Sequence, residues 1–129
     1  MQKVTAAVIE EGGRVLIARR KAADRFGGLW EFPGGKLEPG EAPESGLRRE
    51  LGEELGVETR VGEFLGAFPY ESAWLSIELL AFRVSIERGE IRPIDHDEIA
   101  WVRPADLPGY EFTEPDRPLV ALLAAGAAP

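Results

Sequence analysis

Short runs of apolar residues, separated by glycine, proline and charged residues, give the first part of the chain the pattern of β-strands. Residues 3–10 and 14–20 form two such runs, and Glu11-Gly12-Gly13 lies between them. A Gly-Gly pair between apolar runs is typical of a hairpin turn. Further strands are predicted over residues 29–32, 59–70, 73–87 and 98–102, and the run over 73–87 is long enough to bend or to contain a bulge.

One helix is predicted between Pro43 and Gly56. Leu47, Leu51 and Leu55 recur every four residues and so form one apolar stripe of a helix. Proline is favoured at the first helical position and glycine just beyond the last one, and both ends of this segment fit that rule.

A second helix is predicted over residues 119–125, with Asp116 near its start and Gly126 at its end. Between the two predicted helices the chain returns to strand-like runs. This arrangement indicates an α+β fold in which a mixed β-sheet carries at least two helices. A length of 129 residues suits a single domain over residues 1–129.

Composition narrows the possible function classes. Apolar residues make up 44% of the chain and charged residues 29%, so the chain can bury a core. A net charge of −8 leaves no large basic stripe for polymeric DNA or RNA and weakens binding to anionic membranes. The chain has no cysteine, which excludes thiol nucleophiles and thiolate metal sites. We expect no secretory signal, no membrane span and a cytoplasmic location.

The predicted first helix carries an unfavourable group of acidic residues. Glu50, Glu53 and Glu54 fall within roughly one third of the helix circumference, where like charges cost ~0.2–0.5 kcal/mol per pair. They also lie in its C-terminal half, where the helix dipole disfavours negative charge. A solvated face shared with Arg48 and Arg49 is one explanation. The other is a bound divalent cation such as Mg²⁺ or Mn²⁺, which prefers carboxylate oxygens.

The spacing of these residues carries a family resemblance. Gly35 is followed after five residues by Glu41 and, after seven more, by Arg49-Glu50-Leu51-Gly52-Glu53-Glu54-Leu55-Gly56-Val57. This segment, residues 35–57, matches the signature (the Nudix box) of the Nudix hydrolases at every fixed position. Residues 28–36 and 115–119 extend the likeness to the MutT-like nucleoside triphosphate pyrophosphohydrolases, which the chain resembles.

The resemblance implies an α/β/α sandwich with a mixed sheet, in which the box forms a loop, a helix and a loop. It also implies hydrolysis of a (deoxy)nucleoside triphosphate to the monophosphate and pyrophosphate, with Mg²⁺ as cofactor and Mn²⁺ as the alternative ion. By the same resemblance, Glu50, Glu53 and Glu54 are metal ligands, with the backbone of Gly35 beside them. Arg49 would hold the loop through Glu41 and orient a helix carboxylate.

A carboxylate from a later loop is also implied at the metal. Asp95 has the expected spacing before Trp101, and Glu98 is the alternative. Either this carboxylate or one of the three box glutamates would be the general base. His96, the single histidine of the chain, is expected to be a loop or strand-edge residue rather than a catalyst.

A nucleobase needs an apolar wall and a few polar groups at its edge. Phe32, Tyr70 and Trp74 are candidate walls, although each could equally be a core residue. Asp116 stands where MutT-like enzymes place a base-reading Asn or Asp, and a helix N-cap is the alternative. Arg20 is a candidate nucleotide contact or a solvated arginine. A buried carboxylate suits an amino group of cytosine or guanine, so cytosine, guanine or oxidised guanine nucleotides are candidate substrates.

Two other functions remain compatible with the sequence. One is a Nudix hydrolase of ADP-ribose, nucleotide sugars or dinucleoside polyphosphates, for which Pro69 and Tyr70 match poorly. The other is a non-catalytic nucleotide-binding module, which the complete set of box glutamates disfavours. In every case the expected partner is a small nucleotide, and the protein is expected to be a monomer or a homodimer.

Overall fold

The computed structural model describes residues 1–126, so the last three residues of the predicted 1–129 domain lie outside the described residues. The described part contains a mixed β-sheet, two α-helices and two short 3₁₀ helices. In chain order these are β1 Gln2–Glu11, β2 Arg14–Arg20, β3 Trp30–Glu31, α1 Pro43–Leu55, β4 Glu58–Glu71, β5 Ser76–Arg88, β6 His96–Val102, the 3₁₀ helices Pro104–Gly109 and Glu114–Asp116, and α2 Arg117–Ala125.

Most predicted elements are confirmed, with differences at their ends. Gly12 and Gly13 both adopt positive φ in the predicted hairpin turn, at 58° and 75°. The bulge predicted in the run over 73–87 is confirmed, because Glu58 pairs with Arg88 and Thr59 with Ile86, which leaves Glu87 of β5 as an extra residue. Two further register shifts, between Val61 and Gly66, place extra residues on β4. The last strand begins at His96, two residues earlier than predicted. The 3₁₀ helices lack a hydrophobic period of their own and are missed by the sequence pattern.

β1 lies at the centre of the sheet. It runs parallel to β5, and β5 pairs in turn with the antiparallel β4. β1 and β2 pair only near their hairpin, at Glu10↔Val15 and Glu11↔Arg14, and β2 then pairs with both β3 and β6.

The loop between β3 and α1, residues 32–42, is called the box loop, and its first part lies where β1 and β2 separate. Ala7 N–H donates to the Pro33 carbonyl (2.7 Å), and Thr5 N–H donates to the Gly35 carbonyl (2.8 Å). Backbone hydrogen bonds to the central strand therefore hold the first part of the box loop in place.

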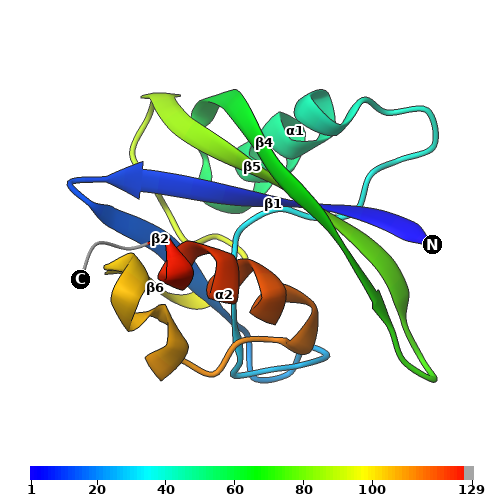
Figure 1. Ribbon diagram of the computed structural model, residues 1–129. Helices are drawn as coiled ribbons and strands as arrows, with labels where there is room; N and C mark the ends of the chain where they lie inside the picture. Colours follow the sequence, from blue (N-terminus) through cyan, green and yellow to red (C-terminus); the bar gives the residue numbers. More distant parts are fainter. Residues whose placement is uncertain (127–129) are drawn as a thin grey trace.

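The two helices cover opposite faces of the sheet (Figure 1). Leu47, Leu51 and Leu55 of α1 are fully buried against one face, as their spacing predicts. Leu119 and Val120 of α2 pack against the other face. The fold is therefore the α/β/α sandwich with a mixed sheet that the sequence predicts. Within residues 1–126, no helix is long and apolar enough to cross a membrane.

Candidate active site

Two glycines let the loop before α1 lie close to β1 on one side and to α1 on the other. Gly34 has φ +148°, and a Cβ placed there would lie 2.0 Å from the carbonyl oxygen of Thr5. A Cβ at Gly35 would lie 2.5 Å from the carboxylate carbon of Glu50. A side chain at either position would therefore collide with the backbone or with the carboxylate that the helix presents there.

Glu54 and Glu50 are the two box carboxylates that line the adjoining cleft. Glu54 is 9% exposed, and its carboxylate accepts the Gly34 N–H at 3.0 Å. Burial, reinforced by the neighbouring charge of Glu31, raises the pKa of Glu54 to about 9. Burial also raises the pKa of Glu50. Both shifts arise mainly from burial of a carboxylate, and a bound cation would favour the charged forms of both groups.

Glu53 differs from its two neighbours on the helix. Its side chain is 59% exposed, and Arg49 is its ion-pair partner at 3.4 Å. It lies outside the cleft lining, so its role as a metal ligand stays a prediction.

Arg49 ties the helix to the box loop. Its guanidinium donates to both oxygens of Glu41, at 2.8 and 2.9 Å, and to the Lys36 carbonyl at 3.2 Å. The hydrogen bond from Arg49 is the main reason that the pKa of Glu41 falls to about 2. A further contact at 3.2 Å joins Arg49 to Glu50. These contacts are those expected of a residue that holds the loop and orients a helix carboxylate.

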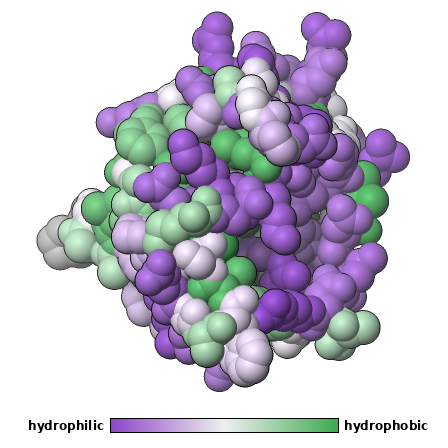
Figure 2. Space-filling model, turned by 90° about the vertical axis from the view of Figure 1, so that its right-hand side faces the viewer, coloured by the Kyte–Doolittle hydropathy of each residue, from purple (hydrophilic) through white to green (hydrophobic). Residues whose placement is uncertain are grey.

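A cleft of about 450 Å³ extends away from the box carboxylates. Apolar and polar residues from both halves of the chain line it, including Phe32, Leu79, Thr113, Asp116, Arg20, Arg25 and Lys36. Its size falls within the range of small-molecule sites. The face of the molecule in Figure 2 is largely hydrophilic, with scattered hydrophobic patches and a hollow near its centre.

Phe32 and Asp116 both belong to the cleft. Phe32 is buried and stacks on Phe112, with ring centroids 5.3 Å apart, so it is a core residue and a cleft wall at once. Asp116 is 5% exposed and accepts a hydrogen bond from the Thr113 hydroxyl at 3.0 Å. Asp116 occupies the N-cap position of α2, but its side chain makes no cap hydrogen bond to the helix. Burial, with a smaller effect from Glu31, raises the pKa of Asp116 to about 8.

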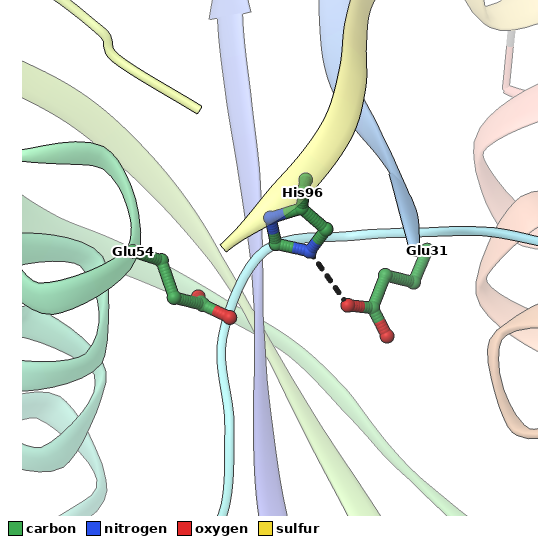
Figure 3. A group of neighbouring side chains, drawn as sticks. All are labelled: Glu31, Glu54 and His96. Atoms are coloured by element: carbon green, nitrogen blue, oxygen red, sulfur yellow. Dashed lines mark hydrogen bonds and ion pairs between the residues drawn. The ribbon is translucent and has the colours of Figure 1, made fainter. Parts of the chain in front are cut away.

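A second group of side chains, which the sequence analysis missed as a unit, lies beside Glu54. Figure 3 shows Glu31, Glu54 and His96, which come from β3, α1 and β6. One potential ligand atom from each lies within 4.8 Å of the others. Glu31 is the missed residue, and the available signal was a charged side chain between Trp30 and Phe32 in an apolar run.

Glu31 is also the partner of Arg20. The Arg20 guanidinium contacts Glu31 Oε1 at 2.9 Å, and Arg20 also lines the cleft. Arg20 is therefore a paired cleft residue, and the solvated alternative is wrong.

The remaining candidates divide between the site and the surface. Asp95 joins Glu31, Glu54 and His96 around an adjoining cavity of about 320 Å³, whereas Glu98 pairs with Arg19 at 3.1 Å. Asp95 is therefore the later-loop carboxylate that lies beside the box.

The two other aromatic candidates lie outside the cleft lining. The Tyr70 hydroxyl donates to Glu114 at 2.7 Å, and Trp74 is 83% exposed in the β4–β5 turn. The fold buries neither ring in the cleft wall, so their role as base contacts has no support in this geometry.

Comparison with known proteins agrees with this geometry. A family model of the NUDIX domain matches residues 1–123. The chain belongs to the Nudix family. The CTP pyrophosphohydrolase of Escherichia coli (strain K12) is 40% identical over 120 residues, which cover 93% of this chain and 89% of that protein. A protein of Mycobacterium tuberculosis named putative 8-oxo-dGTP diphosphatase 2 is 38% identical over 126 residues, covering 95% and 88%.

Comparison with solved structures also finds a similar fold. The solution structure of the E. coli ORF135 protein superposes with a TM-score of 0.83 at 38% identity, covering 100% of this chain and 95% of that one. Sequence and fold together identify this chain as a MutT-like Nudix hydrolase, an enzyme that acts on phosphoanhydride bonds.

Proposed function

We propose that this Nudix enzyme hydrolyses (deoxy)nucleoside triphosphates to the monophosphate and pyrophosphate, with cytosine, guanine or oxidised guanine nucleotides as the preferred substrates. The observation that carries the proposal is one continuous cleft, with Glu50 and Glu54 at one part of its lining and Phe32 and Asp116 at another. The names of the relatives, which refer to CTP and 8-oxo-dGTP, agree with it.

The site fits a hard divalent cation. Burial raises the pKa of both Glu50 and Glu54, and Asp95 lies beside Glu54 in the adjoining cavity. Oxygen donors of this kind suit Mg²⁺, with Mn²⁺ as a possible substitute. We assign Glu50 and Glu54 as ligands, with Glu53, Asp95 and the Gly35 backbone completing the set. When bound, such an ion neutralises phosphate oxygens and makes a water molecule more acidic.

The residues of the chain bind the triphosphate and move one proton. A net charge of −8 repels a polyphosphate, so local positive charge is needed. Arg20, Arg25 and Lys36 line the cleft and supply it. One carboxylate of the group Glu50, Glu53, Glu54 and Asp95 accepts the proton of the attacking water. Arg49 acts by holding the loop and Glu50 in place rather than by touching the substrate.

Base recognition is assigned to Phe32 and Asp116, which line the same cleft as the box carboxylates. Phe32 offers an apolar surface for a flat ring, and Asp116 offers a buried polar group beside it. An ionised Asp116 accepts a hydrogen bond from an exocyclic amino group, which cytosine and guanine carry and uracil lacks. Tyr70 and Trp74 have no part in this assignment.

The test is pyrophosphate release from normal, methylated and oxidised (deoxy)nucleoside triphosphates with Mg²⁺ and then Mn²⁺. ADP-ribose, a nucleotide sugar and a dinucleoside polyphosphate are assayed alongside. Glu54→Gln is expected to abolish most activity, whereas Glu44→Gln, an exposed change at the other end of α1, should leave it unchanged. Turnover of the diphosphate compounds without turnover of any triphosphate would replace the proposed substrate class, and full activity of Glu54→Gln would contradict the metal assignment.

The proposed substrate and the composition of the chain also bear on the location and partners of the enzyme. Free nucleoside triphosphates and a chain without cysteine both fit a cytoplasmic location. A polymeric nucleic acid is a poor partner for a protein of net charge −8. We propose a monomer or a homodimer, and sedimentation equilibrium of the purified protein tests which one forms.

A further inference from the structure

We infer that His96 is a positioning residue for the nucleotide cleft, acting through the carboxylate of Glu31. The inference rests on the proposed function, because it concerns how the cleft discriminates between bases. His96 lines the adjoining cavity rather than the cleft, and the role assigned to it is positioning rather than catalytic.

Two donors hold Glu31 from two directions. His96 Nε2 lies 2.8 Å from Oε2, and Arg20 Nη1 lies 2.9 Å from Oε1. The Glu31 side chain is 16% exposed and the His96 side chain 3% exposed. Because each carboxylate oxygen has its own buried or half-buried partner, the carboxylate has one favoured orientation.

The hydrogen bond also fixes the state of the imidazole ring. A carboxylate can only accept, so His96 Nε2 must carry the hydrogen. Among residues 1–126, Nδ1 is buried and has no hydrogen-bond partner. The contact with Glu31 is therefore the hydrogen bond that orients the ring. An apolar side chain would fill the same space without an unpaired atom, which indicates that the contact with Glu31 is what the histidine contributes.

Glu31 lies where its orientation affects the cleft. It lines both the 450 Å³ cleft and the adjoining 320 Å³ cavity. Its charge contributes to the raised pKa of Asp116 on one side and of Glu54 on the other. A change in the direction of this carboxylate therefore alters the field at the residue assigned to base recognition and at a box carboxylate.

The chain brings these residues together by long-range pairing. Residues 31 and 96 are 65 positions apart, and β2 pairs with both of their strands. On the other edge of β3, Trp30 exchanges backbone hydrogen bonds with Glu111 and Thr113, at 2.8 and 2.9 Å. β3 thus links His96 to the segment that carries Asp116.

The kinetic test compares CTP with UTP, which differ at the exocyclic group of the base. His96→Leu should lower the ratio of kcat/KM for CTP to that for UTP by about three- to tenfold, because Glu31 loses one of its two donors. His96→Gln, which can still donate to Glu31, should restore most of the ratio. Val102→Ala truncates a buried residue of the same strand and controls for general loosening of β6; its ratio should match wild type.

The spectroscopic test does not depend on turnover. His96 is the only histidine, so a long-range ¹H–¹⁵N spectrum contains one imidazole. We expect an Nε2–H signal that moves or is lost in Glu31→Ala. A ring protonated at Nδ1 alone would overturn the inference, as would unchanged CTP to UTP ratios in both folded His96 variants.

Failure of the proposed function can be distinguished from failure of the inference about His96. If the wild type hydrolyses no triphosphate, the substrate class is wrong, and CMP and UMP binding replaces the kinetic ratio. Loss of the CMP preference in His96→Leu would then still support the positioning role, and an unchanged preference would refute it.

Discussion

Replacing Glu54 with glutamine should stabilise the metal-free protein while removing its metal response. The Glu54 carboxyl is buried, and its pKa in the fold is about 9 against an ordinary value of 4.5. At pH values between these two pKa values, Glu54 is deprotonated in the unfolded chain but still protonated in the folded chain. The unfolded state therefore binds fewer protons, and the free energy of unfolding falls as the pH rises.

The change in the free energy of unfolding follows from the width of the pH range between the two pKa values of Glu54. Each pH unit in this range lowers the free energy of unfolding of the wild type by about 1.4 kcal/mol. The loss therefore approaches about 4 kcal/mol between about pH 5 and pH 8. Relaxation and water entry reduce the measured value, and we expect at least about half of this slope. Glutamine carries no charge in either state, and its amide oxygen can still accept the Gly34 N–H.

Urea denaturation in EDTA at several pH values measures the effect. The stability advantage of Glu54→Gln over wild type should grow steadily as the pH rises, and added Mg²⁺ should stabilise the wild type far more than the variant. Glu53→Gln is the matched control: its side chain is 59% exposed, so the difference from wild type should not grow in this way. A Glu54→Gln difference that stays constant across the pH range would refute the reasoning.

Three further predictions concern the loop, the backbone and the base. Arg49→Lys should lower kcat/KM with Mg²⁺ by about tenfold or more, because lysine cannot make both bonds to Glu41; unchanged steady-state kinetics would contradict this. Gly34→Ala should lower the free energy of unfolding by about 2 kcal/mol or more, since its Cβ meets the Thr5 carbonyl; urea denaturation measures it, and wild-type stability would exclude that contact. The pKa of Asp116, about 8, predicts that the CTP to UTP preference rises as the carboxyl ionises between about pH 7 and 9, and that Asp116→Asn loses this rise; a parallel profile in both proteins would remove Asp116 from base recognition.

Local spacing was sufficient to predict the box helix and its loop. A residue every four positions forms one stripe of a helix in any fold, and Leu47, Leu51 and Leu55 are buried as that rule requires. Gly34 and Gly35 are needed because the backbone itself comes close to other groups. Such constraints act within a few residues or a few ångströms of the chain, so a sequence records them directly.

Exposure of single aromatic residues could not be predicted in the same way. Phe32, Tyr70 and Trp74 each belong to a predicted strand, yet one is 4% exposed, one is half-buried and one is 83% exposed. Their different environments depend on where β4 and β5 turn and on which segment packs over β3. Choosing Asp95 over Glu98 likewise required the register of β6 with β2, because Arg19 lies opposite Glu98.

The sequence by itself determined the family, the α/β/α sandwich and the segment that carries the box carboxylates, since each depends on spacing along the chain. Tertiary structure alone decided which of these carboxylates are buried, which later acid lies beside them, and that Glu31 and Asp116 line one cleft with His96 in contact with Glu31. The reason is physical: charge and burial at this site come from strands that are 65 residues apart at Glu31 and His96, and their pairing is fixed by packing rather than by local pattern.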